Sequence, residues 1–182
     1  MAFSSTIAYA TMPTHLIIDG YNLLGRTGGL SGHVAAARET LLQALAAYRH
    51  RKNHPITIVF DGWQQGRPVE RREHQAGVQV IYSKRGERAD QVIQRLARDY
   101  GADCAVVSSD QEVARSAKVS GAFVLGAQEF AMKLWSSPRG GMGHKELDTQ
   151  EEEPPARDPK KKGNPRKLPK AERLRNRQLK RF

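Results

Sequence analysis

The fold is indicated by the stretch His15-Leu16-Ile17-Ile18-Asp19-Gly20-Tyr21-Asn22, in which a short apolar run ends in a carboxylate, a glycine and an asparagine. A bounded apolar run of this length predicts a buried β-strand, and Asp-Gly predicts a tight turn directly after it. Parallel sheets carry ligands and catalytic groups beyond the carboxyl ends of their strands. We therefore expect Asp19 at the mouth of a site with Asn22 close by, and a flexible loop over residues 25–29 beside it.

Strand and helix patterns alternate along the next hundred or so residues. Apolar runs predict strands at residues 56–60, 78–82, 105–107 and 121–125, and helical periodicity predicts helices at residues 34–51, 91–100, 110–120 and 127–135. Ser109 with Glu112 predicts a capping box for the third of these helices. This alternation predicts an α/β three-layer sandwich with a mostly parallel five-stranded sheet. Right-handed crossovers then place every strand-to-helix turn at one edge of that sheet.

Charge divides the chain into a nearly neutral body and a basic C-terminal tail. Residues 157–182 hold 12 of the 30 Lys and Arg residues and 2 of the 19 Asp and Glu residues, which leaves 18 basic and 17 acidic residues in the rest. We expect a disordered leader at 1–12, a domain at 13–136, and a linker with a basic tail at 137–182. A single cysteine, Cys104, and the lack of an apolar run that could span a bilayer favour a reducing, cytoplasmic setting.

Acidic side chains arrive at the predicted edge from four turns. They are Asp19, Asp61, Glu87 with Asp90, and Asp110. Clustered carboxylates raise one another's pKa values, so a fold keeps them with a cation or for a function. Oxygen ligands without nearby His or Cys select Mg²⁺ or Mn²⁺, which can activate water and neutralise charge on a phosphate. The residues alone favour metal-assisted hydrolysis of a phosphoester, although acids in a first helical turn, such as Glu87 and Asp90, also complement the helix dipole.

Other phosphate chemistries of α/β proteins lack their motifs in this chain. There is no Walker A sequence, and no G-x-G-x-x-G follows the first predicted strand. Phosphatases with an aspartyl nucleophile carry D-x-D after that strand, whereas position 21 is tyrosine here. A P-loop nucleotidase, a dinucleotide-binding fold and an aspartyl phosphatase are therefore disfavoured.

Four motifs in order resemble those of one family: Ile18-Asp19-Gly20-Tyr21-Asn22, Phe60-Asp61-Gly62, Glu87-Arg88-Ala89-Asp90 and Ser108-Ser109-Asp110. Together they look like the NYN domain family, in its bacterial YacP-like branch within the PIN-like nucleases, over about residues 13–134. The resemblance implies a PIN-like sheet and a metal-dependent endoribonuclease activity, with some relatives acting on RNA at the ribosome.

The resemblance also implies roles for single residues. Asp19, Asp90 and Asp110 would hold Mg²⁺ or Mn²⁺ directly or through water, with help from Glu87, and Asn22 would orient Asp19 or the substrate phosphate. Apart from the resemblance, the residues themselves predict that Trp63, beside Arg67, Arg71 and Arg72, either stacks a base or packs under its own loop. The residues expected to bind substrate are the Asp61 turn and cations near the mouth and in the tail: Asp61, Arg67, Arg71, Arg85, Arg88, Lys160, Lys161, Lys162, Arg166 and Lys167.

The partner expected for the basic tail is RNA (mRNA, rRNA or tRNA), or a ribosome, rather than a membrane. Residues 160–167 have almost nothing to bury and are expected to be disordered when free, whereas residues 171–182 could become a helix on RNA. Two other functions stay open: a non-catalytic RNA-binding or ribosome-associated factor on the same fold, and a small-molecule phosphoesterase, which would have no use for the tail in substrate capture.

Overall fold

The computed structural model describes residues 14–27, 33–62, 68–136 and 169–182. The chain divides into two compact units, Met1–Ser137 and Pro138–Phe182. The predicted leader at 1–12 and most of the predicted linker and tail fall outside the described residues. In the second unit the structure describes one basic helix, α6 (Lys170–Leu179).

The first unit is built on a six-stranded, mostly parallel sheet. Its strands lie in the order β3-β4-β2-β1-β5-β6, and among them the β3–β4 pair alone is antiparallel in the part of the chain that the structure describes. The bounds are β1 His15–Asp19, β2 Ile56–Phe60, β3 Arg71–Gln75, β4 Val78–Tyr82, β5 Cys104–Val107 and β6 Phe123–Leu125. The predicted mostly parallel α/β sheet is confirmed, but it has six strands instead of five.

The additional strand, β3, is an edge strand that the apolar patterns missed. Its sequence, Arg-Arg-Glu-His-Gln, contains no apolar residue, so it shows no alternation. It pairs with β4 across the two-residue turn Ala76-Gly77, whose φ angles are 49° and 81°. Positive φ at both turn residues is typical of a tight β-hairpin, and charged side chains suit an edge that must not pair with another chain.

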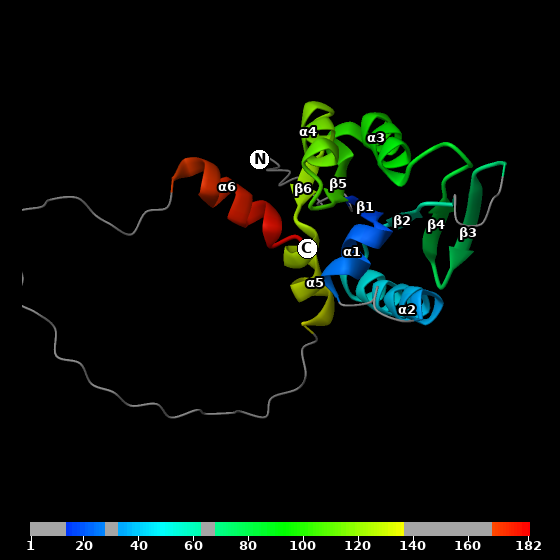
Figure 1. The fold of residues 1–182 in the computed structure, drawn as a ribbon. Coiled ribbons are helices and arrows are strands. Elements are labelled where there is room, and N and C mark those ends of the chain that lie inside the picture. Colours follow the sequence, from blue (N-terminus) through cyan, green and yellow to red (C-terminus); the bar gives the residue numbers. More distant parts are fainter. Residues whose placement is uncertain (1–13, 28–32, 63–67, 137–168) are drawn as a thin grey trace, which may run out of the picture. The chain divides into compact units, whose positions relative to one another are not determined.

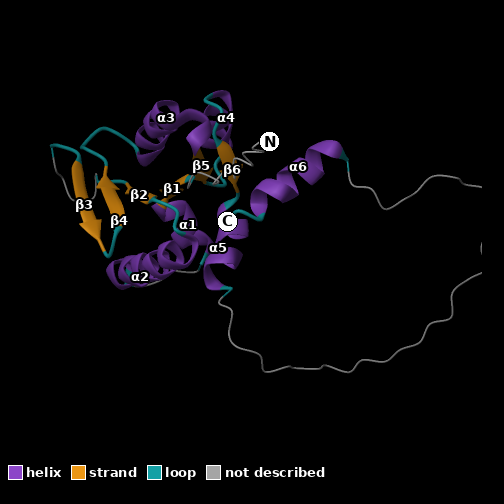
Figure 2. Cartoon of the chain, turned by 180° about the vertical axis from the view of Figure 1, so that it is seen from behind, coloured by secondary structure: helices purple, strands orange, loops and turns teal. Residues whose placement is uncertain are grey.

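Helices cover both faces of the sheet and confirm the predicted three-layer sandwich (Figure 1, Figure 2). One face carries α1 (Gly20–Arg26), α2 (Val34–Lys52) and α5 (Ala127–Trp135), and the other carries α3 (Ala89–Tyr100) and α4 (Gln111–Val119). A 3-10 turn, η2 (Gly101–Asp103), connects α3 to β5. No described helix is both long and apolar enough to pass through a lipid bilayer.

The chain leaves β1 directly into a helix instead of through the predicted turn. Asp19 is the N-cap of α1, and Gly20 is its first residue. A Cβ at Gly20 would lie 2.3 Å from the Phe60 ring, so the glycine is needed for close packing. The loop predicted at residues 25–29 is wrong for Gly25 and Arg26, which belong to α1, while residues 28 and 29 are not described.

The central strands are buried on both faces, which is why they appear in the sequence as continuous apolar runs. Leu16, Ile17 and Ile18 of β1 are all 0% exposed. The core against α3 and α4 includes Ile17, Val59, Ile81, Val92, Ile93, Val106 and Val113. Each large apolar side chain buried in this way contributes roughly 1.5–3 kcal/mol, so the sheet is held firmly between its two helical layers.

β1 lies at the point where the strand order reverses. β2 and β4 are on one side of it, and β5 and β6 are on the other. Open α/β sheets bind ligands beyond the carboxyl ends of the strands at such a point. The register pairs Ile18 with Val107, so the residues that follow them, Asp19 and Ser108, are neighbours at this edge.

Candidate active site

Asp19 is a buried carboxylate held by two hydrogen bonds at the end of β1. It is 7% exposed. Its Oδ1 accepts from the backbone N–H of Asn22 at 3.0 Å, which caps α1. Its Oδ2 accepts from the hydroxyl of Ser108 at 3.3 Å. The side chain is therefore fixed from its own helix and from the neighbouring strand.

The environment of Asp19 raises its pKa from 3.8 to about 6. The largest cause is burial, which disfavours the charged form, and the negative charges of Asp90 and Asp61 act in the same direction. The hydrogen bonds from Asn22 and Ser108 lower the pKa and offset part of this effect. A carboxylate kept in such a position is costly when ionised unless a cation compensates its charge.

Ser108 connects the carboxylate of β1 to the turn between β5 and α4. It is 2% exposed, and its Oγ both donates to Asp19 and accepts from the backbone N–H of Asp110 at 3.1 Å. Asp110 is in turn the N-cap of α4, because its Oδ1 accepts from the N–H groups of Glu112 and Val113 at 2.8 and 3.1 Å. The predicted capping box of Ser109 with Glu112 is therefore wrong.

Asn22 is a second link between the start of α1 and the turn between β5 and α4. Its side-chain oxygen accepts from the backbone N–H of Ser109 at 3.0 Å. The hydroxyl of Ser109, which does not cap α4, instead accepts from the N–H of Ala127 at the start of α5. Asn22 thus holds the β5–α4 turn against α1, and its backbone N–H orients Asp19.

Asp90, in the first turn of α3, belongs to the same acidic edge. Burial raises its pKa most, the ion pair with Arg88 at 2.7 Å opposes this, and the charges of Asp110, Asp61 and Glu112 raise it further. The negative charges of Asp90 and Asp61 likewise raise the pKa of Asp19. Asp90 therefore lies within electrostatic reach of Asp19, Asp61, Asp110 and Glu112.

The carboxylates share an edge without converging on one point. In the residues that the structure describes, no three His, Cys, Asp or Glu side chains lie close enough together to hold a metal ion. The donor set consists of carboxylate oxygens, which suit Mg²⁺ and Mn²⁺, and Mg²⁺ usually keeps several of its waters while one or two carboxylates bind it. The residues therefore fit a hydrated divalent cation that is held partly through water, rather than a closed cage.

Two of the predicted acidic residues have structural partners. Glu87 accepts from Arg95 at 2.6 Å, and Arg95 also binds Glu70. Asp61 accepts from the backbone N–H of Ala89 at 2.6 Å, and so ties the end of β2 to the start of α3. Glu87 thus lies in an ion-pair network, and Asp61 positions the turn that carries Asp90.

The predicted substrate-binding cations are spread over several environments. Arg71 on β3 pairs with Glu73, Arg88 pairs with Asp90, and Arg85 is exposed. The remaining ones lie outside the described residues: Arg67, Lys160, Lys161, Lys162, Arg166 and Lys167.

An aromatic group lines the same edge on the side of β2 and β4. The Tyr21 ring meets the Phe60 ring edge-on at 5.3 Å, and the Tyr82 ring stacks on Phe60 at 5.8 Å. The guanidinium of Arg38, from α2, lies 5.9 Å from the centre of the Phe60 ring. Burial raises the pKa of Tyr21, and the positive charge of Arg38 opposes that rise.

Sequence patterns assigned no role to two of the residues that shape this edge, although Ser108 belongs to one of the four motifs. Ser108 stands directly behind an apolar run at the carboxyl edge, and that position could have identified it. Arg38 lies inside a helix, where no motif indicates it.

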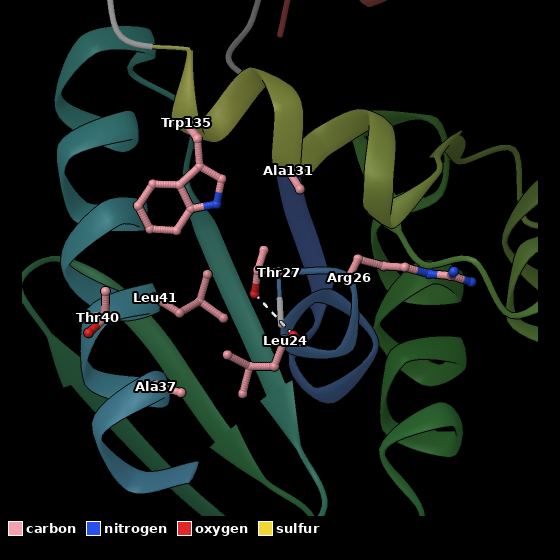
Figure 3. A pocket seen from close by; sticks show the side chains of 8 residues that line it. All are labelled: Leu24, Arg26, Thr27, Ala37, Thr40, Leu41, Ala131 and Trp135. Carbon is pink, nitrogen blue, oxygen red and sulfur yellow. Dashed lines mark hydrogen bonds between the residues drawn. The ribbon is translucent and has the colours of Figure 1, made fainter. Parts of the chain in front are cut away.

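A separate hollow lies between α1, α2 and α5 (Figure 3). Its volume is about 410 Å³, and its lining includes Leu24, Leu41 and the half-exposed Trp135. The hydroxyl of Thr27 in its wall donates to the carbonyl of Leu24 at 3.0 Å (Figure 3). None of the acidic residues lines it, so the candidate active site is the carboxylate edge and not this hollow.

A mostly parallel α/β sheet with acidic side chains from several strand ends at its carboxyl edge has the architecture of a PIN-like nuclease domain. The model of the YacP-like NYN domain family matches residues 16–176. The chain therefore belongs to the YacP-like NYN domain family, a family with a PIN-like nuclease fold.

Similar proteins come from Bacillus subtilis. The uncharacterized protein YacP of strain 168 is 32% identical over 87 residues, which cover 46% of this chain and 51% of that protein, so the chain spans about half the length of the relative it matches. The crystal structure of a single-residue mutant of Rae1 (YacP) is similar with a TM-score of 0.56 and 25% identity, over 66% of this chain and 74% of that one. A second Rae1 (YacP) crystal structure has a TM-score of 0.53 and 26% identity, over 66% and 72% of the two chains.

Proposed function

We propose that this protein is a Mg²⁺- or Mn²⁺-dependent endoribonuclease that hydrolyses RNA phosphodiester bonds. The observation that carries the proposal is the buried carboxylate of Asp19 at the strand-order reversal, joined through Ser108 to the turn of Asp110. A buried charge beside other carboxylates is costly, and a divalent cation would compensate it. Membership of a family with a nuclease fold supports the same chemistry.

Asp19, Asp90 and Asp110 are the residues that would hold the cation, partly through water. The bound ion would supply an activated water and neutralise charge on the phosphate. Asp19 keeps its orientation through the Asn22 N–H and the Ser108 hydroxyl, so it need not reorganise when substrate arrives. Asn22 would act by holding α1 and the β5–α4 turn together. It would not itself attack the phosphate.

RNA is the proposed substrate because of the charge on the C-terminal part of the chain. Residues 157–182 carry 12 basic and 2 acidic residues, and α6 presents Lys170, Arg173, Arg175 and Arg177 within ten residues. Such a segment would bind the RNA backbone electrostatically. Association with a ribosome and a cytoplasmic location belong to the same proposal.

The proposal is tested by incubating the full chain with structured RNA and Mn²⁺. Asp19→Asn and Asp110→Asn are expected to abolish cleavage, because each removes a negative ligand. Asp99→Asn, an exposed residue late in α3, is the matched control and should cleave as the parent does. If the parent, Asp19→Asn, Asp110→Asn and Asp99→Asn all cleave RNA equally well, the assignment of the active site is refuted.

A second candidate is a non-catalytic RNA-binding factor on the same fold. It is favoured by the finding that, within the described ranges, no three potential ligands converge on a metal position. Calorimetric titration with Mn²⁺ separates the two functions. Heat of binding that disappears in Asp19→Asn supports the nuclease, whereas intact RNA affinity without any metal binding supports the factor.

A further inference from the structure

Arg38 differs from three other arginines around the acidic edge. Each of those pairs with a carboxylate: Arg71 with Glu73, Arg88 with Asp90, and Arg95 with Glu70 and Glu87. Arg38 is half-buried, yet it has no ion-pair partner among the residues that the structure describes. Its guanidinium instead lies over the Phe60 ring and close enough to the Tyr21 hydroxyl to act on it electrostatically.

The position of Arg38 places this charge at the carboxyl edge. The last residues of β2 and β4, Phe60 and Tyr82, lie opposite each other in the register, and Tyr21 follows β1 by two residues. Arg38 approaches this aromatic group from the first turns of α2, and Asp61 acts on Tyr21 from the same edge. The Tyr21 hydroxyl thus lies within electrostatic reach of the Arg38 guanidinium, the Tyr82 hydroxyl and the Asp61 carboxylate.

We propose that Arg38, with the hydroxyls of Tyr21 and Tyr82, forms a subsite that binds a backbone phosphate of RNA beside the carboxylate edge. The choice of RNA as the ligand rests on the proposed function. An anionic strand that approaches several carboxylates is repelled, so a cation next to them is needed to seat it. A guanidinium offers a planar set of donors that matches phosphate oxygens, and phenol hydroxyls can donate further hydrogen bonds.

A structural role for Arg38 would be its contact with the Phe60 ring alone. The chain contains a matched case, because Arg51 lies 5.9 Å from the centre of the Tyr48 ring, at the other end of the same helix. Arg38 and Arg51 therefore make the same contact at the same distance. They differ in that Arg38 is at the carboxyl edge and Arg51 is in the last turn of α2.

The test compares Arg38→Gln, Arg38→Lys and Arg51→Gln in the full chain. Binding of a fluorescein-labelled 12-nucleotide single-stranded RNA is measured by anisotropy at several KCl concentrations in EDTA, so that no cleavage interferes. Arg38→Gln is expected to weaken RNA binding about tenfold, as for the loss of one charged hydrogen-bonded contact. The salt slope, which is the change in the logarithm of the binding constant with the logarithm of the KCl concentration, should fall in magnitude by about 0.7. Arg51→Gln should match the parent, and Arg38→Lys should keep the parent's salt slope, since its charge remains.

Two results would overturn the subsite. One is equal affinity and slope for Arg38→Gln and Arg51→Gln. The other is a slope reduced in Arg38→Lys as much as in Arg38→Gln, which would mean that lost packing and not lost charge is responsible. Cleavage with Mn²⁺ is recorded separately. If RNA binding depends on Arg38 but no RNA is cleaved, the subsite is retained and the nuclease activity is rejected. If RNA is cleaved but its binding does not depend on Arg38, the nuclease activity is retained and the subsite is rejected.

Discussion

Replacing Asp19 with asparagine should stabilise the metal-free protein at neutral and alkaline pH. The pKa of Asp19 lies at about 6 in the folded chain instead of 3.8. This difference corresponds to roughly 3 kcal/mol. Because the folded-state pKa is the higher one, the folded chain holds the proton more tightly. The stability contributed by Asp19 is therefore fully present below about pH 4, and it is lost as pH rises through about 6.

Asp19→Asn removes the charge while keeping the shape of the side chain. Its amide oxygen can still accept from the Asn22 N–H, and its amide NH₂ can donate to Ser108 Oγ. At pH 8 the variant should be up to about 3 kcal/mol more stable than the parent, or roughly 10 °C in melting temperature for a domain of this size. At pH 4 the advantage should shrink to about 0.5 kcal/mol.

The measurement is thermal unfolding from pH 4 to pH 8 in EDTA, followed by circular dichroism, with Asp99→Asn as the control. A variant that melts below the parent at pH 8 would show that ionised Asp19 is not costly, and the reasoning about its burial would be refuted. With saturating Mn²⁺ the order should reverse. The parent should gain stability by mass action, and Asp19→Asn should gain little.

Three further substitutions and one deletion give distinct outcomes. Ser108→Ala should cost about 1–3 kcal/mol in urea unfolding, because it leaves the partly buried N–H of Asp110 without its partner; an unchanged midpoint would contradict the link. Gly62→Ala places a Cβ 2.0 Å from the Ser83 carbonyl oxygen and should unfold the domain at 25 °C. Gly86→Ala places a Cβ where nothing lies within 4 Å, so it should cost only the roughly 1 kcal/mol that a φ of 82° imposes on alanine. Equal melting temperatures for these two variants would contradict the packing argument. Deleting residues 157–182 should weaken RNA binding and flatten its salt dependence, and unchanged turnover of the true substrate would instead favour a small-molecule phosphoesterase.

Apolar patterns were sufficient for most elements of the fold, because the parallel strands are buried on both faces. Strands β2 and β4 and helix α5 begin and end where the sequence predicted. The patterns failed at β3, whose Arg-Arg-Glu-His-Gln sequence carries no apolar signal. They failed again at α1, since Asp-Gly after a strand indicates a turn as readily as a helix cap.

The candidate site was predictable as a set of residues at one edge, but not as a set of contacts. The contact between Ser108 and Asp19 joins residues 89 positions apart and depends on the register of β5 against β1. Glu87 was expected beside the metal, yet Arg95 binds it, and that pairing depends on how α3 and the segment before β3 come together. Such partnerships follow from tertiary packing, which local spacing does not contain.

The central location of β1 also limits how far Asp19 can move. Its three buried aliphatic residues have no exposed surface, and it is flanked by strands on both sides. Amide hydrogens on such a strand exchange with solvent only when the whole domain opens. A local opening event is therefore not expected to displace Asp19, the last residue of this strand, by itself. Hydrogen exchange on β1 that is as slow as global unfolding is the signature of that arrangement.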